Sequence, residues 1–174
     1  MKRWILSLSA VLTAVLLMSG CVGRHPDNTA QPVSDGFSCN AVIQYHELEL
    51  QAQLSRQTDG RLRLAFSAPK SLEGVVLGWD GQAMTMELGG MHVAIPTERV
   101  PQGALIQRLL QVLTATPADG TVTEEGYVMS GTVDDLAYTF VCDPQTGLPR
   151  SLSVPSEELE AVFSDCTLLT TDAA

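Results

Sequence analysis

Histidines and paired carboxylates are the residues of this 174-residue chain that could support catalysis or metal binding. His25, His46 and His92 lie far apart, and the sequence contains no His-Glu-x-x-His pair and no Gly-x-Ser-x-Gly elbow. Asp134-Asp135 and Glu124-Glu125 could ligate calcium, but both pairs fall where turns are expected, which favours solvated loop carboxylates. We therefore expect a protein that is not an enzyme and that holds no metal or organic cofactor.

Cys21 ends a segment that is typical of an export signal. Lys2 and Arg3 precede the apolar run 4–18, whose 15 residues are fewer than the roughly 20 of a membrane-spanning helix. The run leads into Met18-Ser19-Gly20-Cys21, which resembles the lipobox of bacterial lipoproteins, with Met18 in place of the commoner leucine. The resemblance implies cleavage before Cys21 and a diacylglycerol on its thiol. The alternative is an ordinary secretory signal with an incidental cysteine.

The charge of the chain is strongly negative. Ten basic and 20 acidic residues give a net charge of −10, which disfavours nucleic acids and anionic headgroups as partners. Loss of residues 1–20 would remove Lys2 and Arg3, so the −10 would become −12. Only acyl chains could then hold the protein at a membrane. We expect it on the outer face of the cell membrane, or at the outer membrane if the host has two.

Three regions follow from the composition. Residues 1–20 are the predicted lipoprotein signal peptide, and residues 21–36 are polar and rich in Gly, Pro and Asp, which is typical of a flexible tether. Residues 37–170 carry the apolar periodicity and form one predicted domain.

Most of this domain alternates between apolar and polar residues, which predicts strands with one buried face. The alternation changes phase near His46-Glu47, so a bulge or sharp bend is expected there. Asp80-Gly81 and Gly89-Gly90 are turn signals between later strands. The predicted strands are 37–45, 48–55, 62–68, 75–79, 84–88, 91–95, 127–133, 136–142, 148–154 and 159–169.

Residues 101–114 depart from this alternation. Apolar residues recur there every three or four positions, and Pro101 suits a first helical turn. A helix this apolar must be buried on most sides. The order of elements predicts a mainly β (α+β) fold, in which a curved antiparallel sheet carries one apolar helix on its concave face.

Several motifs in the predicted sheet resemble the bacterial lipoprotein-carrier (LolA-like) superfamily. They are the turn 143–149 (Asp-Pro-Gln-Thr-Gly-Leu-Pro), Phe163-Ser164, Ser67-Ala68-Pro69 and Leu72-Glu73-Gly74. The superfamily includes the carrier and receptor of lipoprotein sorting, a sigma-factor regulator, mycobacterial lipid-transport lipoproteins and a clostridial germination lipoprotein. The resemblance, over roughly residues 37–169, implies an unclosed β-barrel lidded by helices over an apolar cavity. This chain departs from it in having no amphipathic helix before the first strand.

The fold implied by this resemblance suggests a membrane-anchored, non-enzymatic lipoprotein that binds a lipid or acyl chain between sheet and helix. The alternative is an envelope interaction module whose core is filled by its own side chains and which docks a protein partner. The thioethers of Met84, Met86 and Met91, which cluster beside Trp79, suit an irregular apolar ligand, but they also suit an ordinary core. The predicted cavity residues are Ile43, Leu64, Phe66, Trp79, Met84, Met86, Leu105, Leu109, Phe140 and Leu152.

Three cysteines remain after Cys21, an odd number for an exported chain. If the last three strands are antiparallel neighbours, Cys142 and Cys166 lie two strand spacings apart, roughly 10 Å, which is too far for a disulfide. Cys39 opens the first strand and Cys166 lies near the end of the last, so a bond between them would tie the ends of the domain together if those two strands meet. We therefore predict a disulfide between Cys39 and Cys166, and a free Cys142 that points inward.

Overall fold

The structure is a computed structural model that describes residues 36–80, 83–99, 105–114 and 120–169. The predicted signal peptide, Cys21 and the tether up to residue 35 lie outside the described residues, as do residues 101–104 of the predicted helix. No helix of the described part is long and apolar enough to cross a membrane.

The described chain is mainly β and contains eleven strands and one short α-helix. The helix α2 spans Leu105–Thr114, and two single turns of 3-10 helix occur at η1 (Thr97–Arg99) and η2 (Pro155–Glu157). The strands are β1 (Phe37–Tyr45), β2 (Leu48–Arg56), β3 (Leu62–Ala68), β4 (Val76–Trp79), β5 (Ala83–Leu88), β6 (Met91–Pro96), β7 (Gly120–Val122), β8 (Tyr127–Val133), β9 (Leu136–Cys142), β10 (Pro149–Val154) and β11 (Leu159–Leu168). The predicted strands are thus present, and β7 is an additional one.

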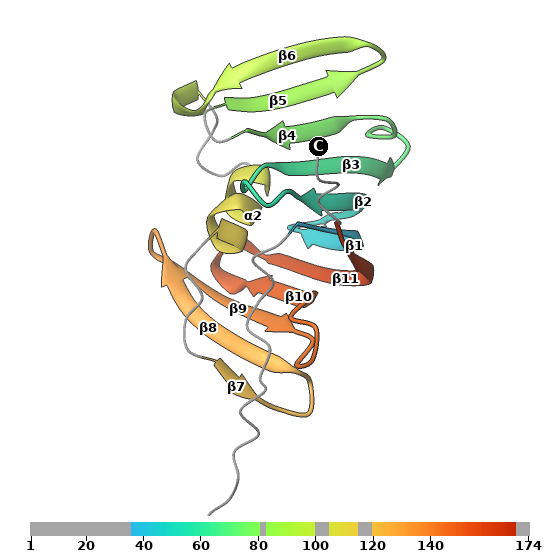
Figure 1. Cartoon of the computed structure of the whole chain (residues 1–174). Helices are drawn as coiled ribbons and strands as arrows, with labels where there is room; N and C mark the ends of the chain where they lie inside the picture. Colours follow the sequence, from blue (N-terminus) through green and yellow to red (C-terminus); the bar gives the residue numbers. More distant parts are fainter. Residues whose placement is uncertain (1–35, 81–82, 100–104, 115–119, 170–174) are drawn as a thin grey trace, which may run out of the picture.

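All strands join one antiparallel sheet in the order β6-β5-β4-β3-β2-β1-β11-β10-β9-β8-β7. Strands β1–β6 form an N-terminal meander and β7–β11 a C-terminal meander, and the two meet where β1 pairs with β11 (Figure 1). The outermost strands β6 and β7 are not paired with each other within the described residues, so the sheet is unclosed. This confirms the predicted antiparallel, mainly β fold.

Tight turns explain the short connections. At His46-Glu47, where a bulge or bend is predicted, the chain makes a two-residue hairpin turn, because Tyr45 pairs with Leu48 and His46 has a φ of 53°. Asp134 and Asp135 form the matching turn between β8 and β9, with φ values of 46° and 65°. Asp and Asn tolerate this left-handed conformation better than most residues, which accounts for the acidic pair.

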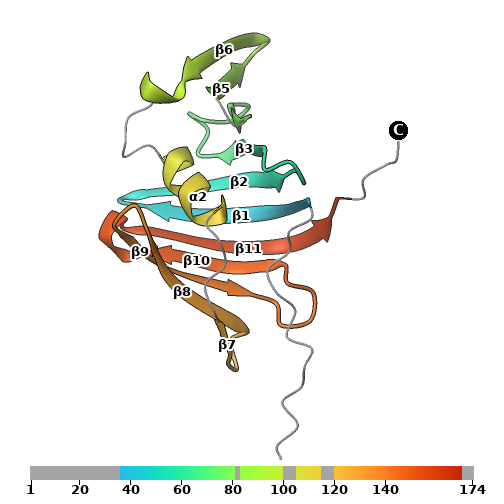
Figure 2. The same cartoon turned by 60° about the vertical axis from the view of Figure 1, so that its left-hand side comes forward.

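The core lies on one side of the central strands. Alternate residues of β1, such as Ile43, and of β3, such as Leu64, are fully buried, while the residues between them face the other side. The helix lies on the core side (Figure 2), because its Leu109, Val112 and Leu113 belong to the same buried cluster. The side chains of Ile106 and Leu110, two further apolar residues of the helix, lie outside the described part.

Candidate functional site

The ten residues predicted to line a cavity differ in burial. Five are buried in the core, four are half-buried against it, and Met86 is exposed. The buried residues are Ile43, Leu64, Phe66, Leu109 and Leu152, and the half-buried ones are Trp79, Met84, Leu105 and Phe140. The centre of the core side is therefore occupied by the protein's own side chains.

The exposed end of this set belongs to a row of apolar residues that crosses four strands. Leu64 of β3 pairs with Leu77 of β4, Leu77 with Met86 of β5, and Met86 with Val93 of β6. Cross-strand partners lie on the same face of a sheet. The exposed fraction rises along the row, from 0% at Leu64 to 38% at Met86 and 46% at Val93. The apolar face of the core thus continues onto β4–β6, where it is open to solvent.

Neighbouring pairs extend this open surface in both directions along the strands. Leu88 pairs with Met91, which is 67% exposed, and Met84 pairs with Ile95. We call this surface the β4–β6 apolar face, and its residues are Leu77, Met84, Met86, Leu88, Met91, Val93 and Ile95. Exposed apolar patches of this kind mark binding surfaces for ligands or partners.

Side-chain bonds hold α2 to the C-terminal meander, away from β4–β6. Arg108 forms a salt bridge of 2.9 Å with Glu157 of η2, and both side chains are largely buried. The side-chain amide of Gln111 donates to Oδ2 of Asp134 at 2.9 Å, in the turn between β8 and β9. Arg108 also donates to Oε1 of Gln111 at 3.2 Å. The sequence carried no signal for the contacts with Glu157 and Asp134, because these two residues are far from the helix along the chain.

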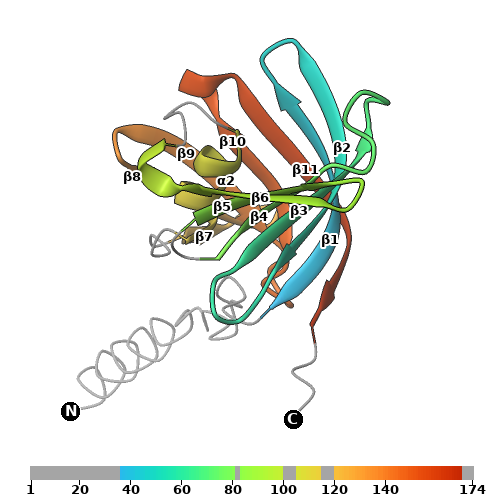
Figure 3. The same ribbon diagram turned by 90° about the horizontal axis from the view of Figure 1, so that it is seen from above.

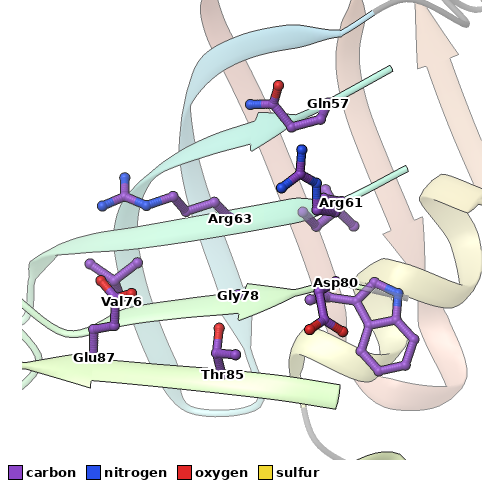
Figure 4. A pocket seen from close by; sticks show the side chains of 10 residues that line it. Gln57, Arg61, Arg63, Val76, Gly78, Asp80, Thr85 and Glu87 are labelled. Carbon is purple, nitrogen blue, oxygen red and sulfur yellow. The ribbon is translucent and has the colours of Figure 1, made fainter. Parts of the chain in front are cut away.

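A polar pocket of about 370 Å³ lies on the opposite side of β3–β5 (Figure 4). Gly78 forms part of its wall, where a Cβ would collide with Oγ1 of Thr85 in its present rotamer. Arg63 and Glu87 add charges of both signs. The pocket is thus suited to small polar molecules and not to an acyl chain.

A second pocket, of about 620 Å³, lies over β1–β3 and is lined by side chains such as Asn40, Gln51 and Ser67. Neither of the two pockets includes a described residue of α2 in its lining. Of the ten predicted cavity residues, Trp79 lines the first pocket and Phe66 the second.

The three described cysteines are thiols in this structure. Cys39 and Cys142 are buried, and Cys166 is half-buried. Burial raises the pKa of Cys142 to about 12, with smaller contributions from Asp143 and Cys166. Cys39 and Cys166 lie on the paired strands β1 and β11, whereas β10 separates Cys142 from β11.

The sequence analysis predicted Met84 and Met86 as cavity residues and grouped Met91 with them, but it did not single out Leu77, Leu88, Val93 or Ile95. The alternation of Met91, Val93 and Ile95 was visible in the sequence. It indicated only a face that is normally buried, because exposure depends on what packs against the strand.

Comparisons with known proteins show which solved structures have a similar fold. No protein-family model matches the sequence, and no curated protein sequence matches it. Among solved structures, an uncharacterised conserved protein from Thermus thermophilus matches with a TM-score of 0.50 and 14% identity, over 79% of this chain and 81% of that one. This likeness shows the fold.

Two further structures match with lower scores. A LolA superfamily protein from Nitrosomonas europaea has a TM-score of 0.45 and 10% identity, over 82% of this chain and 90% of that one. The structure of the CwlD amidase from Clostridioides difficile in complex with the GerS lipoprotein has a TM-score of 0.41 and 14% identity, over 80% of this chain and 86% of the matching one. The first of these two carries the name of the superfamily that the sequence resembles.

Proposed function

We propose that this protein is an extracytoplasmic lipoprotein that binds an acyl chain, of a lipid or of another lipoprotein, on the β4–β6 apolar face. The observation that carries the proposal is the cross-strand row from Leu64 to Val93, which begins in the core and ends exposed. A bound chain would therefore contact the protein's own hydrophobic core at one end. No covalent chemistry is part of this function.

The dimensions of the face suit an extended chain. Strands β5 and β6 have six residues each, which corresponds to a length of about 20 Å at roughly 3.3 Å per residue. Each methylene removed from water contributes about 0.8 kcal/mol, so a chain laid along these strands would bind without a hydrogen bond. The thioethers of Met84, Met86 and Met91 adapt to ligands of irregular shape.

In this proposal the site lies on the β4–β6 part of the curved sheet (Figure 3), and α2 is not one of its walls. The ties of α2 to Glu157 and Asp134 hold the helix near the C-terminal meander. The exposure of Met86, Met91 and Val93 supports a site that is open on the side of β6.

The membrane anchor is part of the same proposal. Residues 1–20 would be removed as a signal peptide, Cys21 would carry the lipid, and the tether would hold domain 37–170 off the bilayer. The net charge of −12 after cleavage would keep the domain from lying on an anionic membrane surface.

A second candidate function is the docking of an envelope protein partner on the same face. This function is favoured by the filled centre of the core. Ile43, Leu109 and Leu152 occupy the space there, so a partner would bind to the exposed β4–β6 apolar face. A protein partner can cover an open apolar face without an enclosed cavity.

The test uses the full chain and two matched pairs of substitutions. Met86→Ser with Val93→Ser removes two cross-strand partners from the β4–β6 apolar face. Val42→Ser with Val162→Ser removes a cross-strand pair from the opposite face, where Val162 is 59% exposed. Binding is measured by native mass spectrometry after gentle purification and by titration with a fluorescent fatty acid.

We expect the wild type to co-purify with lipid and to bind the fatty acid. The Met86/Val93 variant should bind at least tenfold more weakly, since about 1 kcal/mol is lost for each shortened side chain. The Val42/Val162 variant should bind like the wild type. A wild-type chain with a clean apo mass and no fatty-acid uptake would contradict acyl binding and leave partner docking as the function.

A further inference from the structure

The two meanders of the sheet are joined by one strand pair. Strands β1–β6 pair among themselves and β7–β11 pair among themselves, and β1–β11 is the pairing that connects the two groups. The first and last strands of the described chain therefore hold the sheet together. A covalent bond at this junction would act on the whole domain.

We propose that Cys39 and Cys166 form a disulfide across the β1–β11 junction. Ser38 pairs with Thr167, and after a register shift Asn40 pairs with Ser164. Continuing the first register by one residue places Cys39 opposite Cys166 and leaves Asp165 as the extra residue of a β-bulge. The φ of 52° at Asp165 fits this assignment.

This register meets the geometric requirement of a disulfide. Directly opposed residues of antiparallel strands have Cα atoms about 4.5–5.5 Å apart, within the roughly 4.4–6.8 Å that disulfides span. Both side chains also lie on the core side, because Cys39 is buried in the core cluster and Cys166 packs against it.

Cys142 is excluded by the strand that separates it from Cys166. Its partner on β10 is Pro149, and the Sγ of Cys166 donates to the carbonyl oxygen of Pro149 at 3.3 Å. Cys142 and Cys166 thus flank β10, two strand spacings or about 10 Å apart, beyond the roughly 7 Å limit for Cα atoms. Cys39 lies one strand farther from Cys142.

The thiols of the pair are protected once the domain has folded. Burial raises the pKa of the Cys39 thiol, and repulsion and a side-chain hydrogen bond involving Cys166 raise it further. Burial also raises the pKa of Cys166, while the hydrogen bond with Cys39 acts in the opposite direction. Because the thiolate is the reactive form, oxidation takes place during folding, before burial is complete.

The oxidant is a disulfide, either of a protein thiol oxidase or of glutathione. The Cys166 thiolate attacks one sulfur of that disulfide, forms a mixed disulfide and releases the first thiol. The Cys39 thiolate then attacks Sγ of Cys166, forms the Cys39–Cys166 bond and releases the second thiol. Two cysteines are oxidised, one disulfide is reduced to two thiols, and these take up the two protons that the cysteines lose.

The experiment is mass mapping of the full chain without reduction. Free thiols are blocked with N-ethylmaleimide, and trypsin then separates the three cysteines, since cleavage after arginine leaves Cys39 in peptide 25–56, Cys142 in 109–150 and Cys166 in 151–174. We expect peptides 25–56 and 151–174 to be linked and peptide 109–150 to carry the blocking group. A link from peptide 109–150 to either of the others would overturn the proposal.

A second experiment tests the disulfide independently of the proposed export. The disulfide depends on export only because export would bring the chain into contact with an oxidant. If the isolated chain carries three blocked cysteines, it is unfolded, refolded in a glutathione redox buffer and mapped again. Formation of the same link then supports the pairing and counts against export to an oxidising compartment. Three blocked cysteines in both arms would refute the disulfide.

Thermal unfolding provides the matched control. Reduction should lower the Tm of the wild type by about 10 °C, because the bond closes a loop between residues 39 and 166. Cys39→Ala and Cys166→Ala should each abolish this difference between oxidised and reduced protein. Cys142→Ala should keep it, whatever its own effect on Tm, and its loss in that variant would contradict the proposal.

Discussion

Asp143 organises the turn between β9 and β10 through its two carboxylate oxygens. Oδ1 accepts the backbone N–H groups of Gln145 at 2.9 Å and Thr146 at 2.8 Å, and the Thr146 hydroxyl at 3.0 Å. Oδ2 accepts Nη2 of Arg150 at 2.6 Å. The backbone N–H groups of Thr146 and Gln145 are the main reason that the pKa of Asp143 falls to about 2. This turn is therefore held by an ionised side chain.

We predict that Asp143→Asn destabilises the domain in a pH-dependent way. The folded-state pKa of about 2 lies below the ordinary value of 3.8. The ionised carboxylate therefore contributes its full stabilisation of the folded state above pH 3.8, and this contribution is lost as the pH falls through 2. The free energy of unfolding of the variant should be about 1 kcal/mol lower than that of the wild type at pH 6. The difference from wild type should shrink between pH 4 and pH 2.

Urea unfolding at pH 6, 4 and 2 measures this difference. Asp135→Asn is the control, because Asp135 lies on an exposed hairpin turn whose left-handed conformation asparagine also tolerates. A variant whose free energy of unfolding parallels the wild type at all three pH values would show that the charge of Asp143 has no part in stability.

At the scale of the elements, α2 and the β5–β6 hairpin differ in the contacts that attach them to the rest of the domain. The helix inserts Leu109, Val112 and Leu113 into the core and is tied by Arg108 to Glu157. The hairpin has one paired neighbour, β4, and its apolar side chains remain partly exposed. The sheet is thus well covered at its centre and open at β4–β6.

We predict that Glu157→Ala weakens the attachment of α2 and lowers the free energy of unfolding by about 2 kcal/mol. The side chains of Arg108 and Glu157 are only 16% and 19% exposed, so loss of the carboxylate leaves a poorly solvated guanidinium without its counter-charge. Adding Arg108→Met should recover part of the loss, because it removes the unpaired charge.

Hydrogen exchange of the α2 amides and the free energy of unfolding report on this change. Glu160→Ala, at an exposed position of β11, is the control and should leave both nearly unchanged. Equal effects of Glu157→Ala and Glu160→Ala would mean that the Arg108–Glu157 pair does not hold the helix.

At the scale of the whole molecule, the net charge of −10 bears on the proposed anchor at Cys21, because the charge determines how the protein could be held at a membrane. A chain this acidic is repelled by anionic membrane surfaces, so attachment to a membrane would require covalently bound acyl chains. One acyl chain alone binds reversibly, whereas two or more hold a protein stably.

We predict that Cys21→Ser releases the protein from membranes into the soluble fraction. The measurement is fractionation of cells that produce the full chain, followed by immunoblotting. Cys142→Ala, which leaves the proposed lipidation site intact, should stay with the membranes. Retention of the Cys21→Ser protein in the membrane fraction would contradict the anchor.

The sequence by itself determined the local structure of this protein. Alternation with a period of two residues identified the strands, and signals such as Asp134-Asp135 and Gly89-Gly90 identified their turns, because both depend on neighbouring residues. The apolar spacing of residues 105–113 likewise indicated the helix. The short strand β7 was missed, since three residues carry too little periodicity.

Only the tertiary structure decided which parts of the apolar face are buried. Leu64 and Met86 have the same alternating pattern and lie in one cross-strand row, yet Leu64 is enclosed and Met86 is exposed. Leu64 belongs to the buried cluster that includes Leu109 of α2, whereas Met86 lies outside this cluster, and α2 is tied to Glu157 and Asp134 in distant parts of the chain. The same holds for Cys39 and Cys166, because pairing between the first and last strands is a long-range contact that no local pattern records.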